Sequence, residues 1–467
     1  MPSRLVRFPT GLLAALTFAL LASSCTVSKA KRQGDRWMEK ERPAAAARAY
    51  ETGVEKKPEN TKLQLRLARA YLASGEPEAA LAPAKAAFDA EEEGSAEVMA
   101  LVLVRIHQWK EAIPLLTDAL VESDNPDLLS ILAEARLSIG QSDLAIESAR
   151  EAKGSSPAND VFLAYLLARN NKPEEAKEIA LSAQASAVNN PEVLADAAVA
   201  LYLAGAHAGS RAAASKALGL AGGDVADWVD DAQSEYAVGA LEVALRKGMR
   251  AWVLNPENPR LAWTLGNWWL EVGEPMWAID LLLVAFRHPD YTFKENAGVQ
   301  VYELVGMKEE DRRADRYAIA MSLAKAFGDL GSYRDQVEML KEAARSVPTA
   351  ESYMQLSDTL IALGRTAEAQ QAAQQALQYG PSDGNASARL ARAAGASGDY
   401  GQAIKYGLQA LRYSPDNAGL ILMIAGFYES NNDLGSALQL VEQGLRANPG
   451  NTDLQITRER LRRVLDM

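Results

Sequence analysis

The chain has 467 residues with 49 basic and 61 acidic side chains, which leaves a net charge of -12 at neutral pH. An acidic chain without a dense lysine and arginine stripe is a poor candidate for nucleic-acid binding. Its three histidines are far apart, and it has no HExxH sequence, phosphate-binding glycine-rich loop or GxSxG elbow. We therefore expect no catalytic residues, metal ligands, cofactor or small-molecule substrate.

Residues 1–24 have the pattern of a secretory signal peptide. Arg4 and Arg7 provide a basic start, and the apolar core over residues 12–22 follows. A core of about 11 residues is too short for a bilayer span, which needs about 20. The single cysteine of the chain, Cys25, comes directly after this segment.

The segment resembles a bacterial lipoprotein signal, in which a small or apolar triplet precedes an invariant cysteine. The triplet here is Ala22, Ser23 and Ser24, although most members carry leucine where Ala22 stands. The resemblance implies cleavage before Cys25, lipid on its sulfur and an acylated amino terminus, followed by a short tether over residues 25–33. Thr26, where an aspartate would favour inner-membrane retention, favours the outer membrane. The alternative is an ordinary signal peptide beside an accidental cysteine.

The remainder of the chain is repetitive. Small residues recur every 31 to 34 positions, and prolines and turn glycines near the carboxyl end keep the same step. Three kinds of residue that recur with the same spacing indicate a repeat protein. The series is Ala46, Ala80, Ala112, Ala145, Ala176, Ser210, Ala244 and Ala278 and, after a jump of 58 residues, Gln336, Ala369, Ala403 and Ala437.

Each period contains two helical patterns. In residues 261–286, apolar residues recur at four-residue spacing up to Trp269, and the sequence from Gly273 to Pro275 breaks the helix. A second apolar series follows. One such hairpin cannot bury its apolar face alone, so neighbouring hairpins must stack.

The hairpins resemble the tetratricopeptide repeat family, whose Leu-Gly, aromatic and alanine positions appear here as Leu265, Gly266, Trp269, Ala278 and Ala285. The resemblance implies an all-α, right-handed superhelical solenoid of about 11–12 helical hairpins.

The repeats predict how the mature chain is divided. We expect an amino-terminal array over residues 34–292, an insertion over 293–316, a carboxyl-terminal array over 317–451 and a capping helix over 452–467. Two interpretations of the insertion are open. It projects and carries binding, or it is one extra helix that adjusts the curvature of the array.

In this family the first helix of each hairpin faces a concave groove that accepts peptides or a partner helix. The resemblance implies that eight residues line this groove. Two readings stay open for the aromatic residues among them, because they could bind a partner or pack between hairpins. The eight are Tyr165, Val199, Tyr202, Tyr236, Arg260, Trp263, Asn267 and Glu271.

These features predict an outer-membrane lipoprotein that faces the periplasm, held in the membrane through acylated Cys25. Its groove would hold other envelope proteins during assembly of a machine for secretion, pilus formation, polysaccharide export or gliding motility. One alternative is a regulator that docks a periplasmic cell-wall enzyme. A cytoplasmic scaffold would require residues 1–24 to remain uncleaved.

Overall fold

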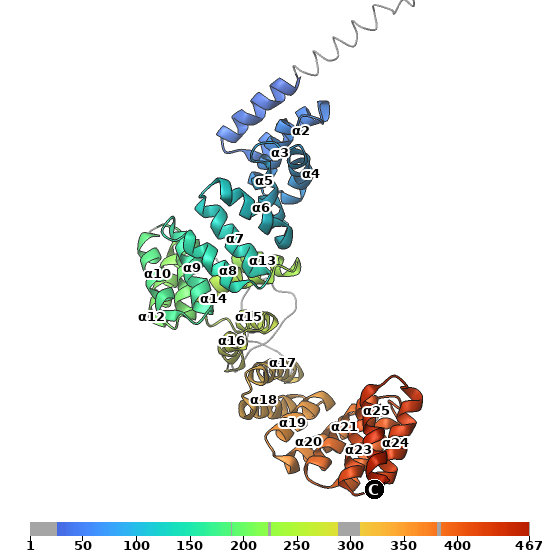
Figure 1. Cartoon of the computed structure of the whole chain (residues 1–467). Helices are drawn as coiled ribbons and strands as arrows, with labels where there is room; N and C mark the ends of the chain where they lie inside the picture. Colours follow the sequence, from blue (N-terminus) through green and yellow to red (C-terminus); the bar gives the residue numbers. More distant parts are fainter. Residues whose placement is uncertain (1–25, 188, 223–225, 288–308, 381–383, 467) are drawn as a thin grey trace, which may run out of the picture. The chain divides into compact units, whose positions relative to one another are not determined.

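The computed structural model describes residues 26–466, except for 188, 223–225, 288–308 and 381–383. Cys25 and the predicted signal peptide lie outside the described residues. Helices joined by short turns make up the described part, with no strand in it, which confirms the predicted all-α solenoid of helical hairpins. The chain forms two compact units, unit 1 up to Leu254 and unit 2 from Asn255 (Figure 1).

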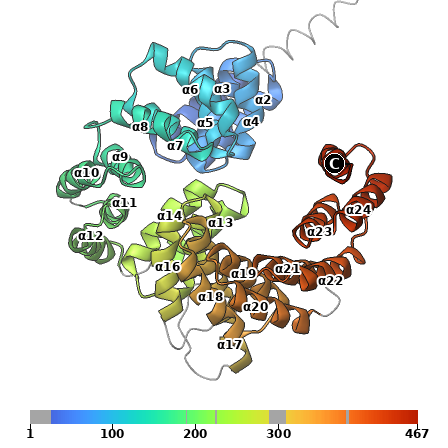
Figure 2. The ribbon, with the colours of Figure 1, turned by 60° about the horizontal axis from the view of Figure 1, so that its bottom comes forward.

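Unit 1 is a stack of helical hairpins that begins with the helix over residues 26–39 paired with α2 (Figures 1 and 2). Odd-numbered helices are the first of each later hairpin, and even-numbered helices are the second. The helices are α2 (Pro43–Lys56), α3 (Thr61–Ser74), α4 (Pro77–Asp89), α5 (Ser95–Arg105), α6 (Trp109–Glu122), α7 (Pro126–Ser138), α8 (Ser142–Glu151), α9 (Pro157–Arg169), α10 (Pro173–Ser186), α11 (Pro191–Leu203), α12 (His207–Leu220), α13 (Ala226–Ala237) and α14 (Leu241–Leu254).

Unit 2 continues the same alternation and ends with one unpaired helix. Its last helix, α25, buries Leu454 and Leu461 against the preceding hairpin. The helices are α15 (Pro259–Glu271), α16 (Pro275–Arg287), α17 (Glu309–Asp329), α18 (Tyr333–Ser346), α19 (Ala350–Ala362), α20 (Thr366–Tyr379), α21 (Gly384–Ala396), α22 (Tyr400–Leu411), α23 (Ala418–Ser430), α24 (Leu434–Ala447) and α25 (Thr452–Leu465).

Local sequence explains where the helices begin and end. Several first helices start behind an asparagine whose side chain accepts a backbone N–H, as Asn190 does from Val193 and Asn258 does from Leu261. The turn inside a hairpin often uses a glycine in the left-handed region, such as Gly273 with φ +81°. Caps and turns therefore set the period of the array.

The small-residue series explains how the hairpins close. Every member occupies the fourth position of a second helix, from Ala46 in α2 to Ala437 in α24. Each alanine of the series is fully buried, and Ser210 is buried with its hydroxyl donating to the carbonyl of Ala198. A larger side chain at this position needs space on the facing helix, as Gln336 of α18 has at Gly328 of α17. The sequence period therefore corresponds to the closest approach within each hairpin.

Two features of the chain differ from regular repetition. The compact units divide after Leu254, inside the segment that the sequence treats as one array. Residues 293–308 of the predicted insertion lie outside the described residues, whereas 309–316 form the start of the long helix α17. Among the described helices, none combines the length and apolarity that crossing a bilayer requires.

Candidate functional site

The first helices of unit 1 carry three of the predicted groove residues. Tyr165 lies on α9, and Val199 and Tyr202 lie on α11. Tyr165 is 2% exposed and Val199 is 1% exposed, so neither side chain is accessible from solvent in this structure. Tyr202 is half-buried, with its ring edge-on to Trp252 of α14 at 4.8 Å between centroids. The groove predicted at these residues is filled by another helix of the same unit.

The helix that fills it is α14 of the same unit. It packs against α7, α11 and α12, and its side chains also reach α9 (Figures 1 and 2). We call the surface that α14 covers the inner face of unit 1. Its residues are Glu134 of α7, Phe162 and Arg169 of α9, and Glu192 and Asp196 of α11.

Ion pairs hold α14 to the inner face of unit 1. Glu242 accepts from Arg169, with 3.1 Å between Oε1 and Nη2. Arg246 donates to Glu134, and the Arg246 guanidinium also lies 5.0 Å from the centre of the Phe162 ring. The α14 residues in these contacts are four positions apart, so they share one side of the helix.

Arg250 completes this row one turn further along. Its Nη2 lies 2.7 Å from Oδ2 of Asp196, and its Nη1 lies 3.6 Å from Oε2 of Glu192. Burial disfavours the charge on Arg250, but Asp196 and Glu192 outweigh burial and raise the pKa of the guanidinium above its ordinary value. Arg250 therefore stays charged although most of its side chain is buried.

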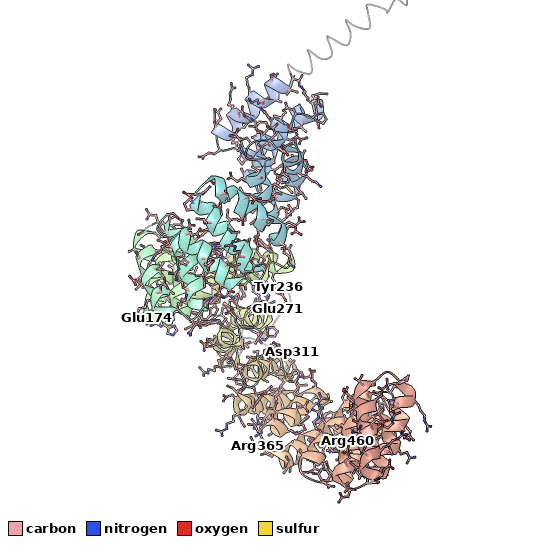
Figure 3. The ribbon with its side chains drawn as sticks, viewed as in Figure 1. Glu174, Tyr236, Glu271, Asp311, Arg365 and Arg460 are labelled. Carbon is pink, nitrogen blue, oxygen red and sulfur yellow. The ribbon has the colours of Figure 1, made fainter. Side chains whose placement is uncertain are left out.

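Tyr236, the fourth predicted groove residue, lies on α13 and is 40% exposed (Figure 3). Its neighbour Glu235 connects α13 to two other parts of unit 1. One carboxylate oxygen lies 3.3 Å from Nε2 of His107, in the turn between α5 and α6. The other accepts from Lys247 of α14. The Lys247 contact joins the two helices of the hairpin, and the His107 contact ties the hairpin to a turn far earlier in the chain.

The remaining predicted residues lie on α15 in unit 2. Arg260, Trp263 and Asn267 are half-buried, and Glu271 is exposed at the end of the helix (Figure 3). Asn267 accepts a hydrogen bond of 2.8 Å from Ser322 of α17. Whether any of these residues binds a partner stays a prediction.

Asn267 and Glu271 line a hollow of about 670 Å³. The other walls come from α17, α18 and α19, including Lys325, Gln336 and Gln355. Lys325 forms an ion pair with Asp329 of its own helix at 3.1 Å, so Glu271 leaves the lining with one excess negative charge. The structure thus brings two of the four predicted α15 residues to one open cavity.

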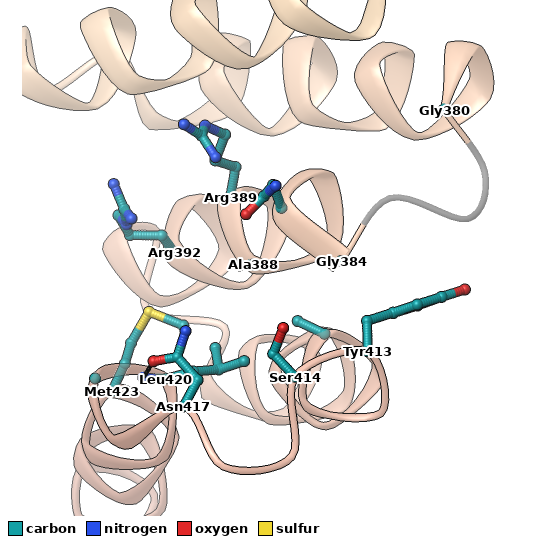
Figure 4. Close-up of a pocket in the computed structure, with 13 residues that line it drawn as sticks. Gly380, Gly384, Ala388, Arg389, Arg392, Tyr413, Ser414, Asn417, Leu420 and Met423 are labelled. Carbon is teal, nitrogen blue, oxygen red and sulfur yellow. Dashed lines mark hydrogen bonds between the residues drawn. The ribbon is translucent and has the colours of Figure 1, made fainter.

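A second hollow, of about 760 Å³, lies between α21, the end of α22 and the start of α23 (Figure 4). Arg389 and Arg392 project from α21, and both donate to Asp358 of α19, at 2.8 and 3.1 Å. Tyr413 and Met423 line the other side. We call the lining of the two hollows the inner face of unit 2.

Sequence reasoning missed this second hollow. Arg389 and Arg392, three residues apart in a first helix, were the available signal, because that spacing places both on one side of the helix. Both hollows are lined by polar and apolar side chains typical of a protein-binding surface. In the part of the chain that the structure describes, no group of three metal-ligating side chains gathers.

Comparison with known proteins agrees with this architecture. Two models of the tetratricopeptide repeat match the chain, one over residues 38–98 and 394–461. The other matches residues 98–160, 321–385 and 354–418. Together the matches cover more than half of the chain. A sequence comparison with curated proteins gives no match.

Solved structures similar to this chain include YrrB, described as a tetratricopeptide repeat protein with an unusual peptide-binding site. It is 15% identical, with a TM-score of 0.35, over 45% of this chain and 97% of YrrB. The Cut9–Hcn1 hetero-tetramer of the APC/C is 14% identical, with a TM-score of 0.33, over 93% and 96%. MamA of Desulfovibrio magneticus RS-1 is 14% identical, with a TM-score of 0.34, over 42% and 97%.

Proposed function

Because the chain belongs to the tetratricopeptide repeat family, we propose that it is a lipid-anchored scaffold for protein partners at the periplasmic side of a bacterial outer membrane. The repeat fold is generally a non-catalytic scaffold for protein–protein interaction. The partners would be components of an envelope machine for secretion, pilus formation, polysaccharide export or gliding motility.

The anchor part of the proposal is supported by the start of the sequence. A basic start, a short apolar core and small residues precede Cys25, which is the single cysteine of the chain. Two or more acyl chains on this residue would provide stable attachment, since each buried methylene contributes about 0.8 kcal/mol. The predicted tether over residues 25–33 would then be short, because the helix over residues 26–39 already packs against α2 and belongs to the first hairpin.

The binding part rests on one observation, the contrast between the two inner faces. In unit 1, α14 covers the inner face over α7, α9 and α11, and the hollow between α3 and α5 is about 400 Å³, whereas the inner face of unit 2 has two hollows of about 670 and 760 Å³. A surface that is concave and lined by polar and aromatic side chains is suited to a protein segment. We therefore place partner capture on the inner face of unit 2.

Cross-linking in intact cells followed by detergent capture of the tagged full-length chain tests this proposal. The test variant combines Arg392→Ala and Tyr413→Ala, two half-exposed side chains of the second hollow. The control variant combines Arg345→Ala and Tyr379→Ala, which removes the same residue types from second helices. Circular dichroism should show unchanged helicity for both.

We expect the wild type and the control to recover a set of envelope components in constant ratio, and the test variant to lose them. Equal recovery by all three proteins would contradict partner binding at the second hollow. Recovery of one soluble cell-wall enzyme, whose activity changes when the purified chain is added, would instead support the alternative that the chain regulates a periplasmic cell-wall enzyme.

A further inference from the structure

The α13–α14 hairpin is docked in reverse order. In several other hairpins the first helix packs beside the first helix of the previous hairpin, as α11 does on α9 and α21 does on α19. Here the second helix, α14, takes that place against α11 and α12. The hairpin is therefore not another layer of the same stack. It turns back over helices that precede it in the chain.

The chemistry of this contact also differs from that of the stack. Hairpins close through buried alanines, whereas α14 meets the inner face of unit 1 through Glu242, Arg246 and Arg250. Their partners come from α9, α7 and α11, three consecutive first helices. Paired charges select a partner and its register more than they add stability. The contact therefore has the character of a recognition surface.

A hollow that is open to solvent borders this contact. It has a volume of about 250 Å³, lies where α7, α9, α11 and α14 meet, and is lined by Phe162, Arg246 and Arg250 among others. The ion pairs of Arg246 and Arg250 therefore border solvent and do not lie in a closed interior.

An apolar row runs along α14 next to its charged row. Leu245, Met249 and Trp252 are buried, at spacings of four and three residues along the helix, and Trp252 packs edge-on against Tyr202 of α11. This is the anchor pattern of an amphipathic helix that lies in a groove. Next to it, Arg246 and Arg250 meet the acidic residues Glu134 and Asp196. A suitable ligand is therefore a helix that carries a row of apolar side chains beside two arginines four residues apart.

From this geometry we propose that the inner face of unit 1 is a binding site for a basic amphipathic helix. Its resident ligand is α14, and a partner helix with the same pattern replaces it. The hairpin partner of α14 would leave with it and break the Glu235–His107 contact, because α13 buries only Val229 and Ala232 and leaves Val238 exposed just beyond its end. This site is separate from the inner face of unit 2 and does not depend on the lipid anchor.

Hydrogen–deuterium exchange of the full-length chain tests the exchange of ligands. The probe is a synthetic peptide of residues 239–256, GALEVALRKGMRAWVLNP, labelled with ¹⁵N so that its mass differs from that of the chain's own segment. The control is the same peptide with Arg246→Glu and Arg250→Glu. An apparent affinity is weakened by the fraction of molecules whose site is occupied, so the probe is added at high concentration.

We expect the probe to raise deuterium uptake in the chain's own α14 several-fold while uptake in α9 and α10 is unchanged. The control peptide should leave α14 protected. If α14 exchanges together with α9 and α11, and the probe changes nothing, then α14 is a permanent part of the core and the proposal is wrong.

A second measurement uses the full-length chain with Arg246→Glu and Arg250→Glu, which repels the resident helix from Glu134 and Asp196. The labelled peptide should bind this variant at least about tenfold more tightly than the wild type, because the site is vacated. Adding Asp196→Lys to the variant should abolish that gain. Equal affinity for all three proteins would overturn the proposal. If the variant loses its helicity, the exchange experiment on the wild type decides.

Discussion

Arg250 of α14 and Asp196 of α11 are 54 residues apart in sequence and 2.7 Å apart between Nη2 and Oδ2. Their pairing fixes α14 against the inner face of unit 1, in the same register as the pairs Arg246–Glu134 and Arg169–Glu242. This relationship explains why the part of the inner face formed by α7, α9 and α11 is covered, although the sequence predicts an open groove there. The two hollows on the inner face of unit 2 are open to a partner.

Removing one member of this pair should destabilise unit 1. Asp196→Ala leaves Arg250, whose side chain is 17% exposed, with Glu192 at 3.6 Å. Breaking a buried ion pair costs about 3–5 kcal/mol, and the remaining acid should hold the loss near the lower end. Urea unfolding followed by circular dichroism gives the change in the free energy of unfolding.

The control for that measurement is a pair at the surface. Arg150 and Glu175 lie 2.8 Å apart with both side chains well exposed, so Glu175→Ala should cost less than about 1 kcal/mol. Similar losses in the two variants would show that α14 is not held by its charges.

Two glycines in neighbouring helices should respond oppositely to alanine. A Cβ at Gly407 of α22 would lie 2.6 Å from Cγ1 of Ile424, which is fully buried. Gly407→Ala should therefore cost about 1–3 kcal/mol through overpacking. Thermal unfolding of unit 2 measures this loss.

Gly426 of α23 is the matched position, since a Cβ there meets nothing within 4 Å. Gly426→Ala should stabilise the helix by about 0.5–1 kcal/mol, because alanine loses less backbone entropy on folding. If both substitutions shifted the melting temperature in the same direction, the packing of Gly407 against Ile424 would be described wrongly.

Stability at high pH should depend on Tyr71 of α3. Burial, followed by the hydrogen bond that its hydroxyl donates to Glu51, raises the pKa of Tyr71 from 10 to about 12. Because the folded pKa lies above the unfolded value, the stabilising contribution is complete below pH 10 and is lost as the pH rises toward 12.

The comparison of wild type with Tyr71→Phe isolates this effect. Between pH 10 and 12 the wild type should lose unfolding free energy more steeply than the variant, whereas below pH 9 the two slopes should agree. Tyr50, whose pKa is also raised by burial and by Asp35, is present in both proteins and cancels. Parallel curves over the whole range would contradict the assigned hydrogen bond.

Lipid attachment makes a separate prediction. Mass spectrometry of the protein purified from cells should show an amino terminus at Cys25 that carries acyl chains, with residues 1–24 removed. Cys25→Ser should move the protein from the membrane fraction to the soluble fraction, because the acylated residue is gone. An intact amino terminus at Met1 would support the cytoplasmic scaffold instead.

Much of the fold could be predicted from the sequence because its contacts are local. Ala112 and Ala369 mark the closest approach of two helices in the same hairpin, and asparagines such as Asn258 mark the starts of helices. These features repeat at a nearly constant period, so the pattern identifies the hairpin and its boundaries. Asn267 and Glu271 were also placed on a first helix, and both line an open hollow.

The sequence by itself therefore determined the helices, the hairpins and the alanine contacts between them, because each depends on residues fewer than about 34 positions apart. The tertiary structure decided the rest. Whether α13 or α14 packs on α11 depends on Arg250 meeting Asp196 and Arg246 meeting Glu134, which lies 112 residues away. Side chains so far apart interact only after the intervening helices have stacked, so no local pattern indicates which inner face is filled and which is open.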